Sequence, residues 1–264
     1  MMAELKGKYI VITGASGGIG KALALEVAKR GATPVLLARS LDKLEQAANE
    51  IKMTTGISAP FYRLDVRSRE DVDTAFEKVL EQIPAIDVLV NNAGFGIFDE
   101  VHTLSLDDMS EMFEVNVFGL IACTKKVLPA MLDQNSGHII NIASQAGKLA
   151  TPKSSVYAAT KHAVLGFTNS LRMELHDTDI HVTAVNPGPI RTNFFDKADT
   201  SGHYKKKVDK WMLDPDMVAK EIADAMFTNK REINLPGWMS IGSKLYQLFP
   251  GLVEKFAGKA FRQK

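Results

Sequence analysis

Short apolar stretches alternate with longer segments of helical periodicity along most of this chain. The short stretches are rich in β-branched residues and predict buried strands at Lys8–Thr13, Thr33–Ala38, Ala59–Leu64, Ile86–Val90, Gly137–Ala143, Asp179–Val185 and Glu232–Leu235. The longer segments repeat apolar residues every three or four positions and predict helices over residues 21–30, 40–56, 68–82, 106–132, 154–175 and 216–229. Strands and helices that alternate at this spacing form a parallel sheet covered on both faces.

The alternation predicts an α/β fold, namely a single Rossmann-type doubly wound domain with a mainly parallel seven-stranded sheet. Right-handed crossovers make the strand order 3-2-1-4-5-6-7 the natural one. Residues 1–264 contain no repeat or linker-like composition, so we expect one domain with its core over about residues 7–235. Residues 193–212 mix aromatic and charged side chains, which suits either a mobile lid over an apolar substrate or a plain surface excursion.

The tail, residues 238–264, lies outside the alternating pattern. Leu245, Leu248 and Leu252 share helical spacing, and Pro250 interrupts it. From residue 241 onward the tail carries five basic residues and one acid. We favour a helical pair packed on its own body or on a partner subunit, and loose contact with an anionic membrane surface is the alternative.

The overall composition argues against a nucleic-acid-binding, disulfide-bonded or membrane-spanning protein. The chain is 45% hydrophobic and 24% charged with a net charge of +1, which is ordinary for a soluble protein and implies no nucleic-acid partner. Cys123 is the single cysteine, so no internal disulfide, cysteine cluster or metal site is expected. No run approaches the roughly 18 apolar residues of a spanning helix. The first residues lead directly into a strand without a secretory apolar region, so we expect a cytoplasmic protein.

A glycine-rich turn, Thr13–Gly20, connects the first strand to the first helix. Glycines let the backbone turn tightly and let a pyrophosphate approach it closely. The helix N-terminus offers free N–H groups and a positive dipole end to phosphates. Because a strand and a helix flank the turn, dinucleotide binding is favoured over a turn without a ligand.

The second strand ends at Arg39 and Ser40, without the acid that commonly binds the adenosine ribose. An arginine suits a 2′-phosphate, so this position favours NADP(H) over NAD(H). A solvated arginine beside a helix N-cap serine is the alternative. Asp65, at the end of the third strand, could accept a hydrogen bond from adenine or act only as a turn residue.

The fourth strand is followed by Asn91, Asn92, Ala93 and Gly94. The two asparagines could brace neighbouring strands or cradle the cofactor, and Ala93–Gly94 would give close access to the backbone. Asn116 lies inside an apolar helical segment, where its side chain competes for backbone partners. If buried, it should hold a hydrogen bond and could open the helix locally. A structural role for Asn116 is more common than a catalytic one.

Ser144 follows the fifth strand, and Tyr157 and Lys161 lie four positions apart on one face of the next helix. Phenols have a pKa of about 10, and a neighbouring ammonium favours the phenolate and lowers that pKa. Such a phenol can give a proton to a carbonyl oxygen or take one from an alcohol, while a serine hydroxyl holds the same oxygen. An ordinary helix with a surface lysine is the alternative, because Tyr-x-x-x-Lys alone is a weak motif.

Taken together, these motifs resemble the short-chain dehydrogenase/reductase family over about residues 7–235. The motif Thr-Gly-x-x-x-Gly-x-Gly falls at Thr13–Gly20, the Ser…Tyr-x-x-x-Lys set at Ser144, Tyr157 and Lys161, and the family's Pro-Gly pair at Pro187–Gly188. The resemblance implies that Tyr157 is the proton donor and acceptor and that Lys161 binds the nicotinamide ribose. It also implies that Asn116 holds a proton-relay water and that Asp65 and Val66 contact adenine.

The catalytic residues expected from these arguments are Asn116, Ser144, Tyr157 and Lys161. The expected cofactor-binding residues are Gly14, Ser16, Gly17, Gly18, Ile19, Gly20, Arg39, Ser40, Asp65, Val66, Asn92, Ala93, Gly94, Tyr157, Lys161, Pro187, Gly188, Ile190 and Thr192. The apolar wall expected for the substrate is Phe95, Ile97, Phe98, Leu149, Phe194 and Phe195, which would suit steroids, acyl chains or small aromatics.

The function predicted from the sequence is NADP(H)-dependent interconversion of a carbonyl and an alcohol on a small, apolar substrate. A non-catalytic nucleotide-sensing protein on the same scaffold is one alternative. A sugar-nucleotide epimerase or dehydratase is a second alternative, but the short region after residue 190 leaves little room for a domain that binds a nucleotide sugar. The segments 106–132 and 154–175 are apolar enough to pair between subunits, so we expect a homodimer or homotetramer.

Overall fold

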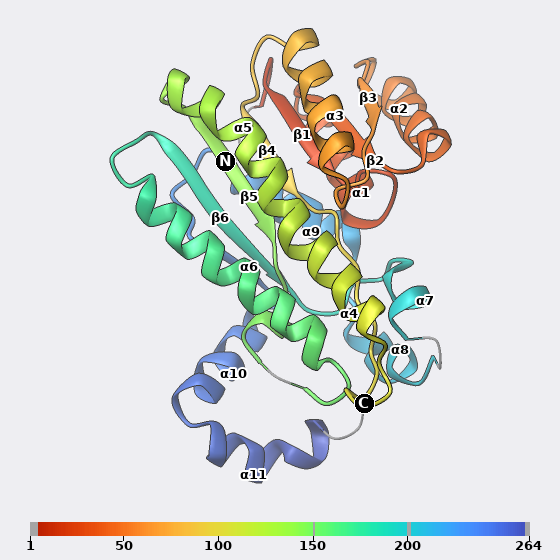
Figure 1. The fold of residues 1–264 in the computed structure, drawn as a ribbon, viewed down its shortest axis with the longest axis vertical. Coiled ribbons are helices and arrows are strands. Elements are labelled where there is room, and N and C mark those ends of the chain that lie inside the picture. The colour runs from red at the N-terminus through yellow and green to blue at the C-terminus, as the bar shows by residue number, and fades with distance from the viewer. Residues whose placement is uncertain (1–4, 150, 200–201, 262–264) are drawn as a thin grey trace.

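Seven parallel strands form the centre of the molecule in this computed structural model, which describes residues 5–149, 151–199 and 202–261, with side chains described through Lys255 (Figure 1). The strands are β1 Tyr9–Thr13, β2 Thr33–Ala38, β3 Phe61–Arg63, β4 Val88–Asn91, β5 Gly137–Ile142, β6 Ile180–Pro187 and β7 Glu232–Leu235. Their order is β3-β2-β1-β4-β5-β6-β7, and every neighbouring pair is parallel. The predicted fold class and strand order are confirmed.

The helices connect successive strands and cover both faces of the sheet. They are α1 Gly18–Lys29, α2 Leu41–Thr55, α3 Arg69–Gln82, α4 Leu106–Phe113, α5 Leu120–Gln134, α6 Ser155–Glu174, α7 Phe194–Ala198, α8 His203–Val208, α9 Pro215–Asp224, α10 Gly237–Leu248 and α11 Pro250–Phe261. Buried residues of α1, α2 and α9 form one hydrophobic cluster with the sheet, and those of α3, α5 and α6 form a second. The strands are therefore buried on both faces, as their continuous apolar runs require.

Several predicted boundaries were wrong. Strand β6 continues through Asn186 and Pro187, which pair with Asn234 and Leu235 of β7, although the proline content had argued against a strand there. Pro187 has no N–H to donate, but the pairing with β7 loses no hydrogen bond there. The residue that donates to the Leu235 carbonyl is the next one, Gly188, at 2.6 Å. Helix α6 spans Ser155–Glu174, within one residue of the predicted 154–175.

The long apolar segment predicted over 106–132 is one continuous helical stretch with a π-helical turn, Glu114–Gly119, between α4 and α5. The whole stretch, Leu106–Gln134, has the length and apolar composition of a membrane-spanning helix, so the expectation that no segment approaches one was wrong. Half of its most apolar window is buried inside the fold. Core helices of globular domains share this property. Asn116 lies within the π-helical turn, so the expected local opening of the helix is confirmed.

The C-terminal part of the tail forms two helices, α10 and α11, separated at Pro250 as predicted. Figure 1 shows them at the lower end of the molecule, away from the β1–β3 side of the sheet. Residues 262–264 and the side chains of 256–261 lie outside the described part of the chain, and they include three of the tail's five basic residues.

Candidate active site

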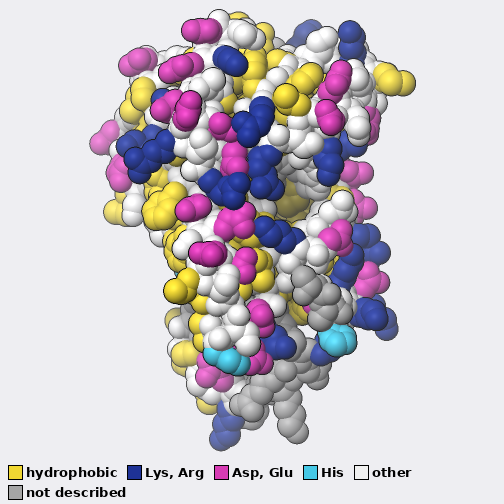
Figure 2. Space-filling view, turned by 45° about the vertical axis from the view of Figure 1, so that its right-hand side comes forward, with side chains coloured by type: hydrophobic (Ala, Val, Ile, Leu, Met, Phe, Trp, Pro, Cys, Tyr) yellow, Lys and Arg dark blue, Asp and Glu magenta, His cyan; other side chains and the backbone are white. Residues whose placement is uncertain are grey.

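A cavity of about 840 Å³ opens where the carboxyl ends of the central strands meet. Ligands of open α/β sheets bind in such a crevice outside the strand ends. Figure 2 shows Lys and Arg side chains gathered on this face of the molecule, next to a hollow with hydrophobic side chains in it. The predicted cofactor residues all line the cavity except Gly20, and three of the four predicted catalytic residues line it, Asn116 being the exception.

The glycine-rich turn after β1 has the backbone shape that only glycine adopts without strain. Gly14 and Gly18 have φ angles of +67° and +54°. Gly20 lies behind the turn, where an added Cβ would be 2.4 Å from the carbonyl oxygen of Gly14. Gly20 therefore allows the close packing of α1 against the turn, which explains why it does not line the cavity.

The asparagines after β4 hold the strand ends together. Asn92 donates from Nδ2 to the carbonyl oxygens of Thr13 at 2.9 Å and Gly14 at 3.2 Å. Asn91 is buried and donates to Thr124 Oγ1 and Asn141 Oδ1, both at 2.9 Å. Asn91 therefore braces β4 against β5 and α5, whereas Asn92 fixes the glycine turn and also lines the cavity.

Arg39, Ser40 and Lys43 line the cavity together at the end of β2. Arg39 is exposed, and Ser40 is the N-cap residue of α2 but makes no side-chain cap hydrogen bond. Sequence reasoning missed Lys43, which lies in the first turn of α2, three positions after its N-cap residue Ser40. The three residues offer two positive charges and a hydroxyl, which is a chemistry suited to a phosphate monoester.

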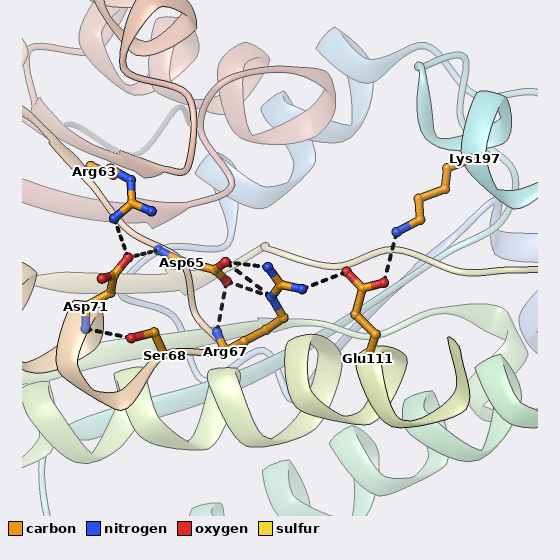
Figure 3. Close-up of polar contacts among 7 residues, drawn as sticks. All are labelled: Arg63, Asp65, Arg67, Ser68, Asp71, Glu111 and Lys197. Atoms are coloured by element: carbon orange, nitrogen blue, oxygen red, sulfur yellow. Dashed lines mark hydrogen bonds and ion pairs between the residues drawn. The ribbon is translucent and has the colours of Figure 1, made fainter. Parts of the chain in front are cut away.

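Asp65, at the end of β3, is held by Arg67 (Figure 3). Its carboxylate accepts hydrogen bonds from Arg67 Nη2 at 2.6 Å and from the Arg67 backbone N–H at 3.1 Å. These side-chain hydrogen bonds from Arg67 hold the pKa of Asp65 below its usual value. Asp65 thus makes the hydrogen bond expected of a turn residue, and because it also lines the cavity next to Val66, its contact with adenine stays a prediction.

Arg67 also belongs to a chain of ion pairs that connects Asp65 with Lys197, two residues that line the cavity (Figure 3). Its Nη1 atom lies 3.0 Å from Glu111 of α4, and Glu111 lies 3.2 Å from Lys197 of α7. The Lys197 ammonium in turn lies 3.7 Å from the ring centre of Phe95. Glu111 therefore connects the end of β3 with the short helices that follow β6.

Asn116 lies behind the cavity wall with its hydrogen-bonding groups satisfied by protein. It accepts from the Phe95 N–H at 3.0 Å and donates to the Phe95 carbonyl at 2.8 Å and to Thr160 Oγ1 at 3.1 Å. Gly94 passes close by, since a Cβ there would lie 3.1 Å from Asn116 Oδ1 and 3.6 Å from Lys161 Nζ. Asn116 thus fixes the loop after β4 beside Lys161.

Ser144, Tyr157 and Lys161 converge on one wall of the cavity. Ser144 Oγ accepts a hydrogen bond from the Ala146 N–H at 3.0 Å, which holds the hydroxyl at the end of β5. Lys161 Nζ donates to the Ile142 carbonyl at 2.9 Å and lies 5.8 Å from the ring centre of Tyr157. The helical spacing of Tyr157 and Lys161 on α6 therefore places both beside the serine, as predicted.

The expected lowering of the tyrosine pKa is not found in this structure. Burial raises the pKa of Tyr157 to about 12, although a hydrogen bond with Ser144 acts in the opposite direction. Burial lowers the pKa of Lys161 to about 8. The ammonium is directed to the Ile142 carbonyl and not to the phenol oxygen, so desolvation of the phenolate outweighs its attraction.

Aromatic side chains fill the other half of the cavity. Phe98 packs edge-on against Tyr157 at 5.7 Å and against Tyr204 at 5.4 Å between ring centres, and Phe194 lies 5.7 Å from Tyr157. Of the predicted apolar wall, Ile97 packs behind this cluster and does not line the cavity, whereas the other five residues do. The segment 193–212, considered above as a lid or a surface excursion, contributes Tyr204, Val208 and Trp211 to the lining. Sequence reasoning missed Trp238 and Met239, because their separation from the rest of the site in the chain gives no periodic signal.

Comparison with known proteins identifies relatives that share this arrangement. A family model described as short chain dehydrogenase matches residues 8–201. An NADP-dependent 3-hydroxy acid dehydrogenase from Schizosaccharomyces pombe is 40% identical over 195 residues, which are 73% of this chain and 75% of that protein.

Two solved structures have the same fold. An alcohol dehydrogenase from Thermococcus sibiricus, complexed with 5-hydroxy-NADP, is 31% identical with a TM-score of 0.78 over 86% of this chain and 95% of its own. A short-chain dehydrogenase/reductase from Burkholderia phymatum, in complex with NAD, is 26% identical with a TM-score of 0.87 over 95% and 96%. The family model covers well over half of the chain, so this oxidoreductase belongs to the short-chain dehydrogenase/reductase family.

Proposed function

We propose that this protein interconverts a carbonyl and an alcohol on a small apolar substrate, with NADP(H) as its cofactor. The observation that carries the proposal is that Ser144, Tyr157 and Lys161 line the same cavity as the glycine-rich turn. A protein that only sensed a nucleotide would have no use for a buried phenol and a serine hydroxyl aimed at a common space. The proposal therefore favours an enzyme over a regulatory scaffold.

The residues present fit a dinucleotide phosphate. The positive φ angles of Gly14 and Gly18 open the backbone turn beside the N-terminus of α1, where free N–H groups favour a pyrophosphate. Arg39 and Lys43 would hold the 2′-phosphate at the end of β2, which supports NADP(H) over NAD(H). When bound, the nicotinamide supplies or accepts the hydride.

The protein's own part in the reaction is to position the substrate oxygen and to move one proton. Ser144 would donate a hydrogen bond to the substrate oxygen and hold it near the Tyr157 hydroxyl. Because the pKa of Tyr157 is raised to about 12, the phenol is protonated at neutral pH and can donate its proton to a carbonyl oxygen during reduction. Lys161 would anchor the nicotinamide ribose, and Asn116 would keep the Phe95 loop in place beside it.

The lining of the substrate half supports a neutral, apolar substrate. The relative from Schizosaccharomyces pombe is named for hydroxy acids, whose carboxylate requires a positive partner. Among the lysines and arginines that line the described cavity, Arg39 and Lys43 lie at the end of β2 and Lys161 lies beside the tyrosine. Lys197 is paired with Glu111 and packed on Phe95. The space beyond Tyr157 is instead bordered by aromatic rings.

The test is to compare the wild-type protein with a Tyr157→Phe variant on a panel of ketones and aldehydes, following NADPH oxidation. The variant keeps the ring and its packing and loses only the hydroxyl that carries the proton, so we expect unchanged NADPH affinity and a kcat lower by about 100-fold or more. A Tyr62→Phe variant, whose hydroxyl bonds Gln82 at the surface, serves as the matched control. Wild-type kcat in Tyr157→Phe would refute the assignment.

We also propose that the protein assembles into a homodimer or homotetramer through α5 and α6. Large apolar side chains on this side of the molecule point to solvent, including Phe118 in the π-helical turn and Met173 of α6, which are 63% and 78% exposed. Light scattering on the purified protein gives the mass directly, and a monomer at micromolar concentration would exclude this assembly.

A further inference from the structure

Helix α10 carries its large apolar residues on the side that faces solvent. Trp238, Ile241, Leu245 and Leu248 follow helical spacing along one face, and each is between 49% and 70% exposed. Ser243, which is 2% exposed, lies on the opposite face toward the body of the protein. A surface helix of a globular protein normally has the reverse arrangement, with its apolar face on the core. The outward apolar row therefore requires a partner.

The row continues beyond α10 in both directions. Phe249 and Leu252 extend it to the start of α11 and are 54% and 56% exposed. At its other end Trp238 packs edge-on against Trp211 at 5.9 Å between ring centres, and both indoles line the cavity. The exposed apolar surface is thus continuous with the rim of the candidate active site. We call these six residues with Trp211 the apolar strip.

Basic residues border the apolar strip. Exposed lysines occupy positions 205, 206, 207 and 210, directly before Trp211, and Lys244 and Lys255 are exposed on the helices of the strip. Asp209 is the one acid among residues 205–210, and it is paired with Arg191 at 3.5 Å. Lys205 is paired with Asp196 at 3.0 Å, and the only acid in the tail from residue 241 onward is Glu254. The border of the strip is therefore mainly positively charged. This charge helps to decide whether the tail contacts a partner subunit or an anionic membrane surface.

A second copy of this chain is the less favourable occupant. A two-fold interface brings the same surface patch of both subunits together, so the lysines at the border would face each other. Like charges at an interface oppose association. An anionic lipid bilayer has the opposite effect, because its headgroups attract the lysines while its apolar interior accepts the strip.

We propose that α10, α11 and the turn at Trp211 dock on the surface of an anionic lipid bilayer, with the apolar strip inserted among the acyl chains. Tryptophan at the rim and lysine at the border match the composition of helices that lie in the plane of a membrane interface. The cavity mouth would then face the bilayer, so that an apolar carbonyl compound could enter from the lipid. This last step depends on the proposed function, whereas the docking does not.

The docking is tested with the full chain and sucrose-loaded vesicles of phosphatidylcholine alone or mixed with phosphatidylglycerol, by co-sedimentation. We expect binding to the mixed vesicles that weakens at high salt. In an Ile241→Asp/Leu248→Asp variant the partition coefficient should fall roughly 100-fold, since two apolar anchors become acids. Met53→Asp, which changes an even more exposed apolar residue on α2, should leave binding unchanged.

Three outcomes would overturn the docking proposal: no sedimentation of the wild-type protein with mixed vesicles, equal loss of binding in Met53→Asp, or unchanged binding in the double variant. A lower oligomeric mass of the double variant in light scattering, with no vesicle binding by the wild type, would assign the strip to a second copy instead. Circular dichroism confirms that each variant is folded. NADPH oxidation with a water-soluble carbonyl compound is measured separately, so failure of docking and failure of the proposed function are distinguishable.

Discussion

The two halves of the cavity are built in different ways. The half at β1, β2 and β4 is formed largely by backbone, with the glycine turn and the Asn92 hydrogen bonds as its main determinants. The half beyond Tyr157 is formed by aromatic side chains such as Phe98, Phe194 and Tyr204, which come from separate loops and short helices. The first half requires a fixed chain geometry, whereas the second requires only that rings fill the space.

The family model covers the backbone-built half in full and the aromatic half only in part. The family model ends at residue 201, so the glycine turn and the Ser144, Tyr157 and Lys161 set lie inside it, while Trp211 and Trp238 lie outside. A backbone-built half tolerates few substitutions, and a half built from side chains can change its shape by single replacements. Substrate choice is therefore expected to reside in the aromatic half. Glu111 links the halves through Arg67 and Lys197.

The largest loss of NADPH affinity is expected when a methyl group is added to a glycine of the backbone-built half. In Gly20→Ala the new Cβ would lie 2.4 Å from the Gly14 carbonyl oxygen, so the turn must shift. Such overpacking costs about 1–3 kcal/mol, which corresponds to roughly a 100-fold weaker NADPH affinity at the upper end. Isothermal titration calorimetry measures this affinity. Gly166→Ala, where a Cβ meets nothing within 4 Å, is the control and should bind NADPH normally. Wild-type affinity in Gly20→Ala would show that the turn is not built as described.

The stability of the whole sheet should depend on pH through His138, a residue that belongs to neither half of the cavity. Burial lowers the pKa of His138 to about 3, and its ring is held between Thr183 Oγ1 and the Phe227 N–H. The unfolded chain takes up the proton near pH 6.5, so stability is complete above that pH and is lost as the pH falls toward 3. At pH 5 the loss is about 2 kcal/mol.

Urea denaturation between pH 7.5 and 4, followed by tryptophan fluorescence, measures this loss of stability. His138→Gln should flatten the dependence, whereas His176→Gln, at an exposed histidine, should not. Both halves of the cavity should fail together at low pH, because the sheet supports both. Loss of NADPH binding well before unfolding would contradict this expectation.

A smaller effect is expected at the end of β2. Arg39→Ala and Lys43→Ala should each weaken NADPH binding by roughly tenfold, since each removes one charged partner of a phosphate. Binding of NADH, which lacks that phosphate, should change little. The ratio of kcat/KM for the two cofactors measures the selectivity. Lys52→Ala, at the far end of α2, is the control, and equal losses for NADPH and NADH would exclude a role in selectivity.

The smallest effect is expected in the aromatic half. Trp211→Ala removes an indole at the cavity rim that is 60% exposed, so KM for bulky carbonyl substrates should rise about threefold through lost apolar contact. The KM for NADPH and the turnover of small substrates should stay the same. Met53→Ala, at an exposed position on α2, provides the comparison. A change in the KM for NADPH would show that the two halves are not independent.

The sequence predicted the sheet order, most strand positions and the residues around the glycine turn, because each follows from local spacing. Asp65 and Arg39 were identified as cavity residues, but the hydrogen bonds of Asp65 to Arg67 could not be foreseen from a turn signal. The raised pKa of Tyr157 was not foreseen either, because burial outweighs the neighbouring ammonium and is a property of the packed fold. The aromatic half depends on loops that meet only in three dimensions.

The π-helical turn at Glu114–Gly119 has a consequence for how this gene can tolerate insertions and deletions. A π turn accommodates one residue more than an α turn of the same rise, and each residue of an α-helix rotates the chain by about 100°. Deleting a single codon here would restore a regular helix and swing the amide of Asn116 away from the Phe95 backbone. Length changes in this turn should therefore abolish activity, while the exposed stretch at residues 101–103 should accept them.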